Sequence, residues 1–112
     1  MGTTYSPRAI GGVSAALTAD SGSIQAGATL CDQGINIVGT VATIADSCIM
    51  PADVGQYSSI IVTNQAANSL DLFPNVGGAF DGGTANIAVA VAGGATVELI
   101  QSGTDGLAWV SH

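Results

Sequence analysis

The residue types that most often carry out chemistry in proteins are scarce in this chain. It has no lysine, and its one histidine, His112, is the last residue. A general base must be held in a fixed orientation beside its substrate, which a terminal residue is poorly placed to achieve. A Cys–His dyad with Cys31 or Cys48, or a Ser–His–Asp triad, would need the C-terminus folded into a pocket. The sequence therefore predicts no catalytic residues, no cofactor and no enzyme activity.

The acidic residues are scattered singly, and none follows the alternating Asp/Asn loop closed by Glu that an EF-hand calcium site needs. One loop arrangement stays open, in which Asp81 binds calcium together with Asp71 or Asn75. The alternative, which we favour, is that each aspartate caps a turn by accepting hydrogen bonds from nearby backbone N–H groups. We therefore expect no metal site.

The two cysteines, Cys31 and Cys48, are expected to be buried and reduced. The N-terminal sequence MGTTYSPRAIGG lacks the apolar segment of a secretory signal, which indicates synthesis and use in a cytoplasm. Disulfides rarely persist in that compartment, and free cysteine is among the most buried residue types. A structural disulfide between the two thiols is the alternative.

Glycine and tryptophan allow several interpretations. The pairs Gly77–Gly78 and Gly82–Gly83 lack the lysine and the strand–loop–helix context of a phosphate-binding loop, so we assign them to backbone geometry. An ice-binding surface is not favoured, because no regular ladder of threonines is present. Trp109 is either a core residue or a subunit contact, since large aromatic residues are enriched at the centres of interfaces.

Charge is the most unusual property of the composition. Only 8% of the 112 residues are charged, against about 25% in an average soluble domain, while 47% are hydrophobic. Arg8 is the only basic side chain besides His112, and the net charge of −7 opposes binding to nucleic acid. The hydrophobic content also excludes intrinsic disorder. An exterior with so few ionic groups is typical of a component of an assembly.

Transmembrane segments are not expected. The longest stretches without a charge, Val54–Leu70 and Gly82–Val97, are interrupted by Gln, Ser, Asn and paired glycines. A spanning helix needs about 20 mostly apolar residues, so neither stretch qualifies. We therefore predict partners other than a membrane.

Alternation of apolar and polar residues recurs along the chain, and it predicts half-buried β-strands. No segment has a convincing helical period. The clearer strand candidates are Tyr57–Thr63, Ser69–Phe73, Asn86–Val91, Ala95–Gln101 and Leu107–Ser111. Weaker candidates are Val13–Thr18, Ala28–Cys31, Ile35–Val38 and Val41–Ile44.

Turn signals separate these candidates and predict the topology. The segments Asn64–Asn68, Gly93–Gly94 and Ser102–Gly106 are typical of tight loops between paired strands. The longest irregular piece is Pro74–Thr84, in which Phe80 is expected to contact the core. Short strands with frequent turns predict an all-β fold, either a single antiparallel β-sandwich or a small barrel.

The first residues differ from the rest and predict an extended arm. Residues 1–12 contain Pro7 and the only arginine, so we divide the chain into an N-terminal arm, residues 1–12, and a single β domain, residues 13–112. In our hypothesis Arg8 meets an acidic neighbour and Tyr5 anchors the arm. Together with Trp109, the residues Tyr5, Pro7 and Arg8 form the predicted interface.

From Cys48 onward the chain resembles a β-module found in structural proteins of tailed bacteriophages. The resemblance covers a little over half of the chain, and the N-terminal half departs from the pattern. It lies in Ile49–Ala52, Val54–Tyr57, Ile61–Asn64, Ala67–Pro74, the glycine loop Gly77–Gly83 and Thr104–Trp109. Modules of this kind occur in head decoration (cement) proteins and in head or tail fibres, usually as trimers.

The resemblance implies a virion structural protein without catalytic function. The short chain, without a fibrous segment, favours decoration over a fibre. The resemblance then implies a homotrimer that stabilises the capsid at junctions between major capsid proteins. Such a protein would be made in the host cytoplasm and lie on the outer capsid surface. The alternative is a fibre knob that binds a host receptor, although 4% aromatic residues are few for a carbohydrate platform.

Overall fold

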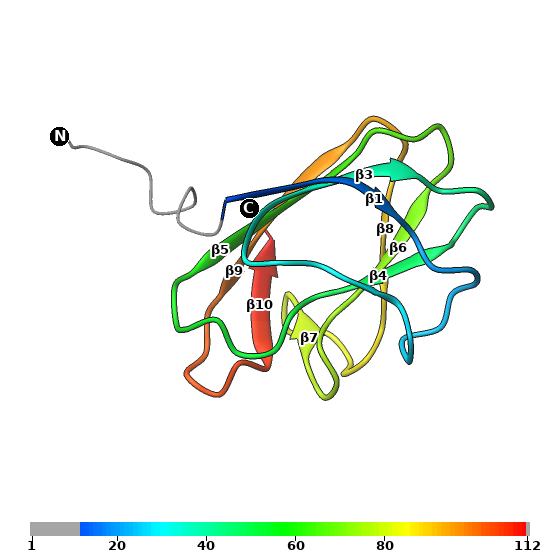
Figure 1. Cartoon of the computed structure of the whole chain (residues 1–112). Coiled ribbons are helices and arrows are strands. Elements are labelled where there is room, and N and C mark those ends of the chain that lie inside the picture. Colours follow the sequence, from blue (N-terminus) through cyan, green and yellow to red (C-terminus); the bar gives the residue numbers. More distant parts are fainter. Residues whose placement is uncertain (1–11, 112) are drawn as a thin grey trace, which may run out of the picture.

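The computed structural model describes residues 12–111, and within that range the chain is all-β, with ten strands and no helix (Figure 1). It follows that none of the described residues belongs to a helix able to cross a membrane. The strands are β1 (Val13–Thr18), β2 (Thr29–Leu30), β3 (Gly34–Thr40), β4 (Ser47–Ile49), β5 (Ser59–Asn64), β6 (Leu70–Phe73), β7 (Ala79–Phe80), β8 (Val89–Val91), β9 (Thr96–Gln101) and β10 (Ala108–Ser111).

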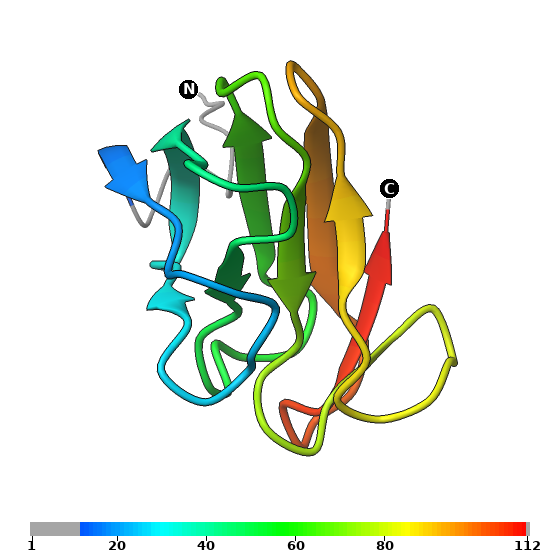
Figure 2. The same cartoon turned by 90° about the vertical axis from the view of Figure 1, so that its right-hand side faces the viewer.

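The strands form two sheets. The larger sheet has six strands in the order β1-β3-β5-β9-β10-β7, and the smaller has four in the order β2-β4-β6-β8. In Figure 1 the smaller sheet lies to the right of β5, β9 and β10, so that in Figure 2, which is seen from that side, it lies in front of the larger sheet. The larger sheet therefore has two strands more than the smaller one.

The first six strands alternate between the two sheets, so the chain winds as a coil. Strands β1, β3 and β5 are parallel neighbours in the larger sheet, and β2, β4 and β6 are parallel neighbours in the smaller one. The pairing of β3 with β5 runs from Gly34↔Ile60 to Val38↔Asn64. The last part of the chain adds antiparallel pairs, because β9 lies between β5 and β10 and β8 pairs with β6.

The prediction of an antiparallel arrangement is therefore wrong for much of the fold. Within residues 12–111, five of the eight strand pairings are parallel. The loops Asn64–Asn68 and Gly93–Gly94 connect strands of different sheets and are not hairpin loops. Parallel neighbours need a long connection, and here a strand of the opposite sheet supplies it. Only Ser102–Gly106 joins an antiparallel pair, β9 and β10, as expected.

Most predicted strands are present, and two segments show where the pattern misled. Val41–Ile44 forms no strand, because the Asp46 carboxylate accepts a hydrogen bond from the Thr43 N–H (3.0 Å) and closes a turn there. The strand lies further on, at Ser47–Ile49, where Ser47 and Cys48 are both buried. These two small residues give no alternation, so the pattern did not reveal β4.

The segment Asn86–Val91 is a strand only from Val89 onward. Asn86 has a positive φ of 65° and serves as a loop anchor, since its Oδ1 accepts hydrogen bonds from the Gly77 N–H (2.6 Å) and from Gln25 Nε2 (3.1 Å). Ile87, expected on the buried face, is 58% exposed. The local amide contacts of Asn86 thus delay the start of the strand.

A single hydrophobic core lies between the sheets. The larger sheet contributes Val38, Ile60, Val62, Phe80, Leu99 and Trp109, and the smaller sheet contributes Cys48, Leu70, Leu72 and Val91. Phe80 is 7% exposed and contacts the core from the irregular segment, as expected. This core fixes which residues of the larger sheet face inward and which face outward.

Buried amides fasten the loops to this core. Gln101 is fully buried, and its Oε1 accepts a hydrogen bond from the Val54 N–H (2.9 Å) while its Nε2 donates to Asp53 Oδ1 (2.7 Å). Asn64, also fully buried, donates to the backbone carbonyls of Asn68 and Val91, both at 2.9 Å. Every buried polar side-chain atom among the described residues has a partner, so these amides are well accommodated.

Candidate interaction surface

The outer face of the six-stranded sheet is rich in apolar, mostly β-branched side chains. We call this surface the outer face. Successive side chains of a strand point to opposite sides of the sheet, so the residues that alternate with the core residues point to the outer face. Its members are Val13, Ile35, Ile37, Ser59, Ile61, Thr63, Thr96, Glu98, Ile100, Ala108 and Val110.

Strand register brings these side chains together in rows. Val13 pairs with Ile35, and Ile35 pairs with Ile61, so three apolar residues adjoin across β1, β3 and β5. Ile100 pairs with Val110 in the neighbouring row. Residues directly opposite on one face of a sheet have their Cβ atoms about 5 Å apart, so each row forms a compact apolar group. Where β5 meets β9 polar residues adjoin these groups, because Ile61 is opposite Glu98 and Ile100 is opposite Ser59.

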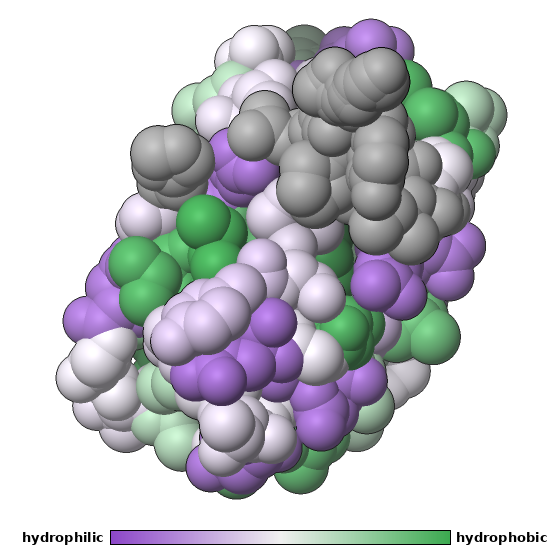
Figure 3. All heavy atoms as spheres, turned by 90° about the vertical axis from the view of Figure 1, so that its left-hand side faces the viewer, coloured by the Kyte–Doolittle hydropathy of each residue, from purple (hydrophilic) through white to green (hydrophobic). Residues whose placement is uncertain are grey.

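Solvent reaches this area. Val13 is 61% and Val110 is 44% exposed, while the four isoleucines between them are partly exposed. Glu98 is the only ionisable member of the outer face as defined. Figure 3 views the molecule from the side where β5 and β9 lie in Figure 1, and green hydrophobic areas appear there among hydrophilic ones. Exposed apolar side chains gathered on one sheet face make this surface a candidate for contact with protein.

Sequence reasoning missed the outer face for a specific reason. In β3 the alternation is inverted, since Asn36 is buried while Ile35 and Ile37 point outward. Asn36 is held inside because its Oδ1 accepts from the Asp32 N–H (2.7 Å) and its Nδ2 donates to the Asp32 carbonyl (2.9 Å). The signal that could have revealed it is the run Ile60-Ile61-Val62, which places apolar residues on both faces of β5.

The predicted interface residues fall into two groups. Tyr5, Pro7 and Arg8 lie outside the described residues. Trp109 is 1% exposed within the single chain, and its indole Nε1 donates to Asn75 Oδ1 at 2.8 Å. A side chain so deeply buried has almost no surface left for a partner. Trp109 is a core residue in this structure.

The possible calcium ligands have other partners. Both oxygens of Asp81 accept hydrogen bonds from Ser111, one from the backbone N–H and one from the hydroxyl, each at 2.7 Å. Asp71 accepts a hydrogen bond from the Ser23 hydroxyl. Asn75 is buried beside Trp109 and donates to the Gly106 carbonyl (2.7 Å). Within residues 12–111, no cluster of three or more His, Cys, Asp or Glu side chains could hold a metal ion.

The two cysteines are free thiols with no exposed surface. They lie close enough for a hydrogen bond between their side chains, and this bond and the burial of the thiol raise the pKa of Cys31. A raised pKa keeps a thiol protonated and unreactive. The expectation of buried, reduced cysteines agrees with this arrangement.

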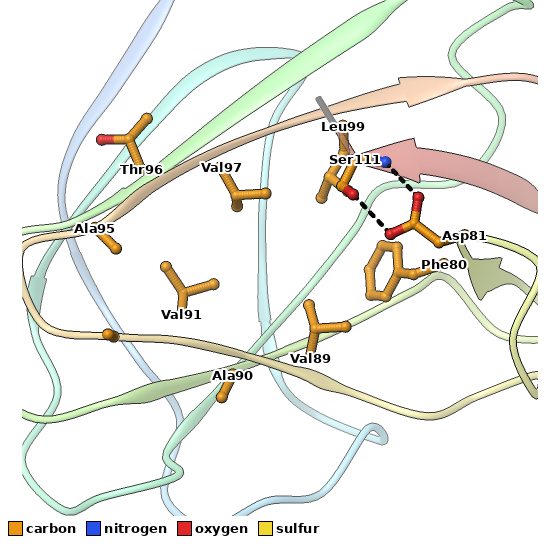
Figure 4. Close-up of a pocket in the computed structure, with 11 residues that line it drawn as sticks. Phe80, Asp81, Val89, Ala90, Val91, Ala95, Thr96, Val97, Leu99 and Ser111 are labelled. Atoms are coloured by element: carbon orange, nitrogen blue, oxygen red, sulfur yellow. Dashed lines mark hydrogen bonds between the residues drawn. The ribbon is translucent and has the colours of Figure 1, made fainter.

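An apolar slot opens where the smaller sheet ends. It has a volume of about 380 Å³ and lies between β8 on one side and β9 and β10 on the other. Figure 4 shows Val89, Val91, Val97, Leu99 and Phe80 around the slot, with Asp81 and Ser111 at one end. The slot arises because no strand of the smaller sheet lies beyond β8 among the described residues, while the larger sheet continues.

Comparison with models of protein families gives no match, and a search of the curated proteins gives none either. The outer face and the slot are therefore the two features of the described residues that indicate a function.

Proposed function

We propose that this protein is a virion structural protein that decorates a phage capsid and stabilises it. It binds as a homotrimer at junctions between major capsid proteins, on the outer capsid surface, after synthesis in the host cytoplasm. In this proposal the two sheets form a β-sandwich that presents its outer face to other protein subunits. The sequence resemblance to phage β-modules motivates the choice of partner.

The observation that carries the proposal is the outer face. Six valine and isoleucine side chains, five of them paired in register with one another, are suited to contact with protein, and Glu98 is the one ionisable group among the members. A standard interface buries about 800 Å² on each partner. The described structure has an accessible surface of 5357 Å², so one contact of that size would use about a seventh of it.

The physical advantage to a capsid follows from linkage. A ligand that binds the assembled lattice and not its separated subunits stabilises the lattice by the free energy of that binding. Such a ligand needs a rigid body, which the single core and the satisfied buried amides supply here. It also needs a contact surface with few charges, and Glu98 is the only ionisable member of the outer face as defined.

The test compares phage heads that carry the protein with heads stripped of it. We expect stripped heads to lose their DNA at a lower temperature, and re-addition of the purified protein to restore the original temperature. Val110→Asp places a charge on the outer face and should weaken this rescue. Ile44→Asp is the matched control, because Ile44 is 68% exposed but lies in the turn between β3 and β4.

Two outcomes would overturn the proposal. One is unchanged heat stability of heads that lack the protein. The other is binding of the isolated protein to host glycans on an array without binding to heads, which would indicate the receptor-binding knob instead.

A further inference from the structure

The slot between β8 and the larger sheet has the shape and lining of a site for an extended peptide. β8 is the edge strand of the smaller sheet among the described residues, and β10 and β7 continue the larger sheet beyond it. An extended segment placed beside β8 would cover Val89 and Val97, which line the slot and are partly exposed. Addition of a strand at an exposed sheet edge is a recurring mode of peptide recognition.

The end of the slot carries a negative charge. Asp81 is exposed, and its two oxygens each accept one hydrogen bond from Ser111. A carboxylate has about four acceptor positions, so Asp81 can still accept the two parallel hydrogen bonds of an arginine. The best occupant therefore combines apolar side chains with a guanidinium group.

The chain itself contains one segment with this chemistry. Residues 1–11 hold Arg8, the only arginine, with Tyr5 and Ile10 as apolar neighbours. They also contain Pro7, which cannot donate a backbone hydrogen bond and is tolerated in a strand only at an edge. A segment added outside β8 would itself be the new edge of the smaller sheet.

We propose that residues 1–11 of one copy dock in the slot of a neighbouring copy, with Arg8 on Asp81 and Ile10 against the apolar lining. This inference rests on the self-association in the proposed function and names a contact that contributes to it in addition to the outer face.

The topology favours a neighbouring copy as the owner of the slot. Residues 1–11 precede β1, which lies at the opposite edge of the larger sheet from β10 and β7. At about 4.8 Å for each step between strands, β1 is about 19 Å from β10, and the body of the sheet lies between them. Arg8 lies five residues before Val13, so an extended backbone carries it at most about 18 Å from the start of β1, which is too short to pass around the sheet to the slot of its own chain. Contacts between opposite ends of identical subunits close into a ring when the rotation from one subunit to the next is a simple fraction of a turn, and a ring of three is the case proposed.

Charge reversal in the full-length chain tests this contact. Arg8→Glu and Asp81→Arg should each weaken self-association about tenfold, because each replaces an attraction by a repulsion. The chain with both substitutions should regain most of the lost affinity. Equal amounts of the two single variants, mixed, should recover part of the affinity, since two of the three contacts in a mixed ring then join groups of opposite charge. Sedimentation of the purified proteins measures all four samples.

The control keeps Arg8→Glu and combines it with Asp105→Arg. Asp105 is exposed in the turn before β10, at the other end of that strand from Ser111, so this pair should give no rescue. Normal association of both single variants would overturn the inference, and so would failure of both the double variant and the mixture to recover. Rescue in the double variant without rescue in the mixture would place the arm in its own slot and also contradict it.

The same proteins distinguish failure of this inference from failure of the proposed function. If charge reversal leaves self-association unchanged while the protein still binds and stabilises heads, the arm contact is wrong and the capsid function stands. If the charge swap restores association but no form of the protein binds heads, the arm contact stands and the capsid function is wrong.

Discussion

The side-chain amide of Asn75 lies between Trp109, in β10, and the turn that precedes β10. Its Oδ1 accepts from Trp109 Nε1 (2.8 Å), and its Nδ2 donates to the Gly106 carbonyl (2.7 Å). Both side chains are buried, so removal of the amide leaves the indole N–H without a partner and without water. An unsatisfied buried donor costs more free energy than the hydrogen bond contributes when it is present.

We therefore expect Asn75→Ala to lower the free energy of unfolding by about 2 kcal/mol. For a chain of this size the melting temperature should fall by about 10 °C. Thermal unfolding followed by circular dichroism measures the change. In a Trp109→Phe background, which has no indole N–H, the same substitution should cost clearly less. Equal costs in the two backgrounds would contradict the assigned role of Asn75.

Two exposed carboxylates make the fold sensitive to acid. Hydrogen bonds from the Ser111 hydroxyl and backbone lower the pKa of Asp81 below its usual 3.8, and hydrogen bonds from the Gly55 backbone and from Gln101 lower that of Asp53. A folded-state pKa below the unfolded value gives stability that is present above the unfolded pKa. That stability is lost as the pH falls through the folded-state value.

The melting temperature should therefore decrease as the pH is lowered from about 4 to about 2. Asp81→Asn and Asp53→Asn should each reduce the slope of this decrease, because neither amide titrates. Calorimetric scans at several pH values measure the slopes. An acid sensitivity that is the same in both variants and in the unmodified chain would show that other groups are responsible.

The sequence identified some residues well and others poorly, for physical reasons. Phe80 and the thiols were placed correctly because large apolar residues and free cysteines are usually buried. The sequence did not decide whether Trp109 is a core residue or an interface residue, because large aromatic residues are common in both places. The buried amides Asn64 and Gln101 were missed because their burial depends on distant loop groups, which local composition does not reveal.

At the level of elements, the turn before β10 packs closely on another loop. Gly106 has a φ of +77°, and a Cβ atom there would lie 2.6 Å from the Asp53 Cβ. Gly82 has a similar φ of +72°, but a Cβ atom at that position would meet nothing within 4 Å. Alanine substitutions at Gly82 and Gly106 therefore separate two free-energy costs. Gly82 reports the cost of a left-handed alanine alone, and Gly106 adds the cost of the steric contact with the loop that carries Asp53.

We expect Gly82→Ala to lower the free energy of unfolding by about 1 kcal/mol, the cost of a left-handed alanine. Gly106→Ala should cost about 2 kcal/mol more, because the loop that carries Asp53 has to move. Chemical denaturation of the two variants measures the difference. Similar losses in both variants would show that the contact between the loops does not contribute.

The elements also show how far local pattern determines a fold. Strands β5, β6, β9 and β10 were predicted to within two residues, because alternating burial leaves a clear pattern in the sequence. Their partners were not predictable in the same way. A short turn can connect two antiparallel neighbours in one sheet, or it can connect strands of opposite sheets. Which of the two connections forms depends on how the whole chain packs. The outer face was hidden for the same reason, since its extent depends on strand order.

At the level of the whole molecule, low charge and an apolar outer face support the same interpretation. A chain with nine charged side chains, eight of them acidic, has few ionic groups with which to keep an apolar sheet face in water. Association removes that face from solvent, at a gain of about 25 cal/mol for each Å² of apolar area. The account therefore depends on self-association of the purified protein.

Sedimentation equilibrium of the purified full-length protein at micromolar concentration tests this claim most directly. A single chain has a mass of 10.9 kDa, and the account predicts a stable species of three chains. Val110→Asp should shift the distribution toward single chains, whereas Ile44→Asp should leave it unchanged. A monodisperse species of 10.9 kDa for the unmodified protein across the whole concentration range would contradict the account.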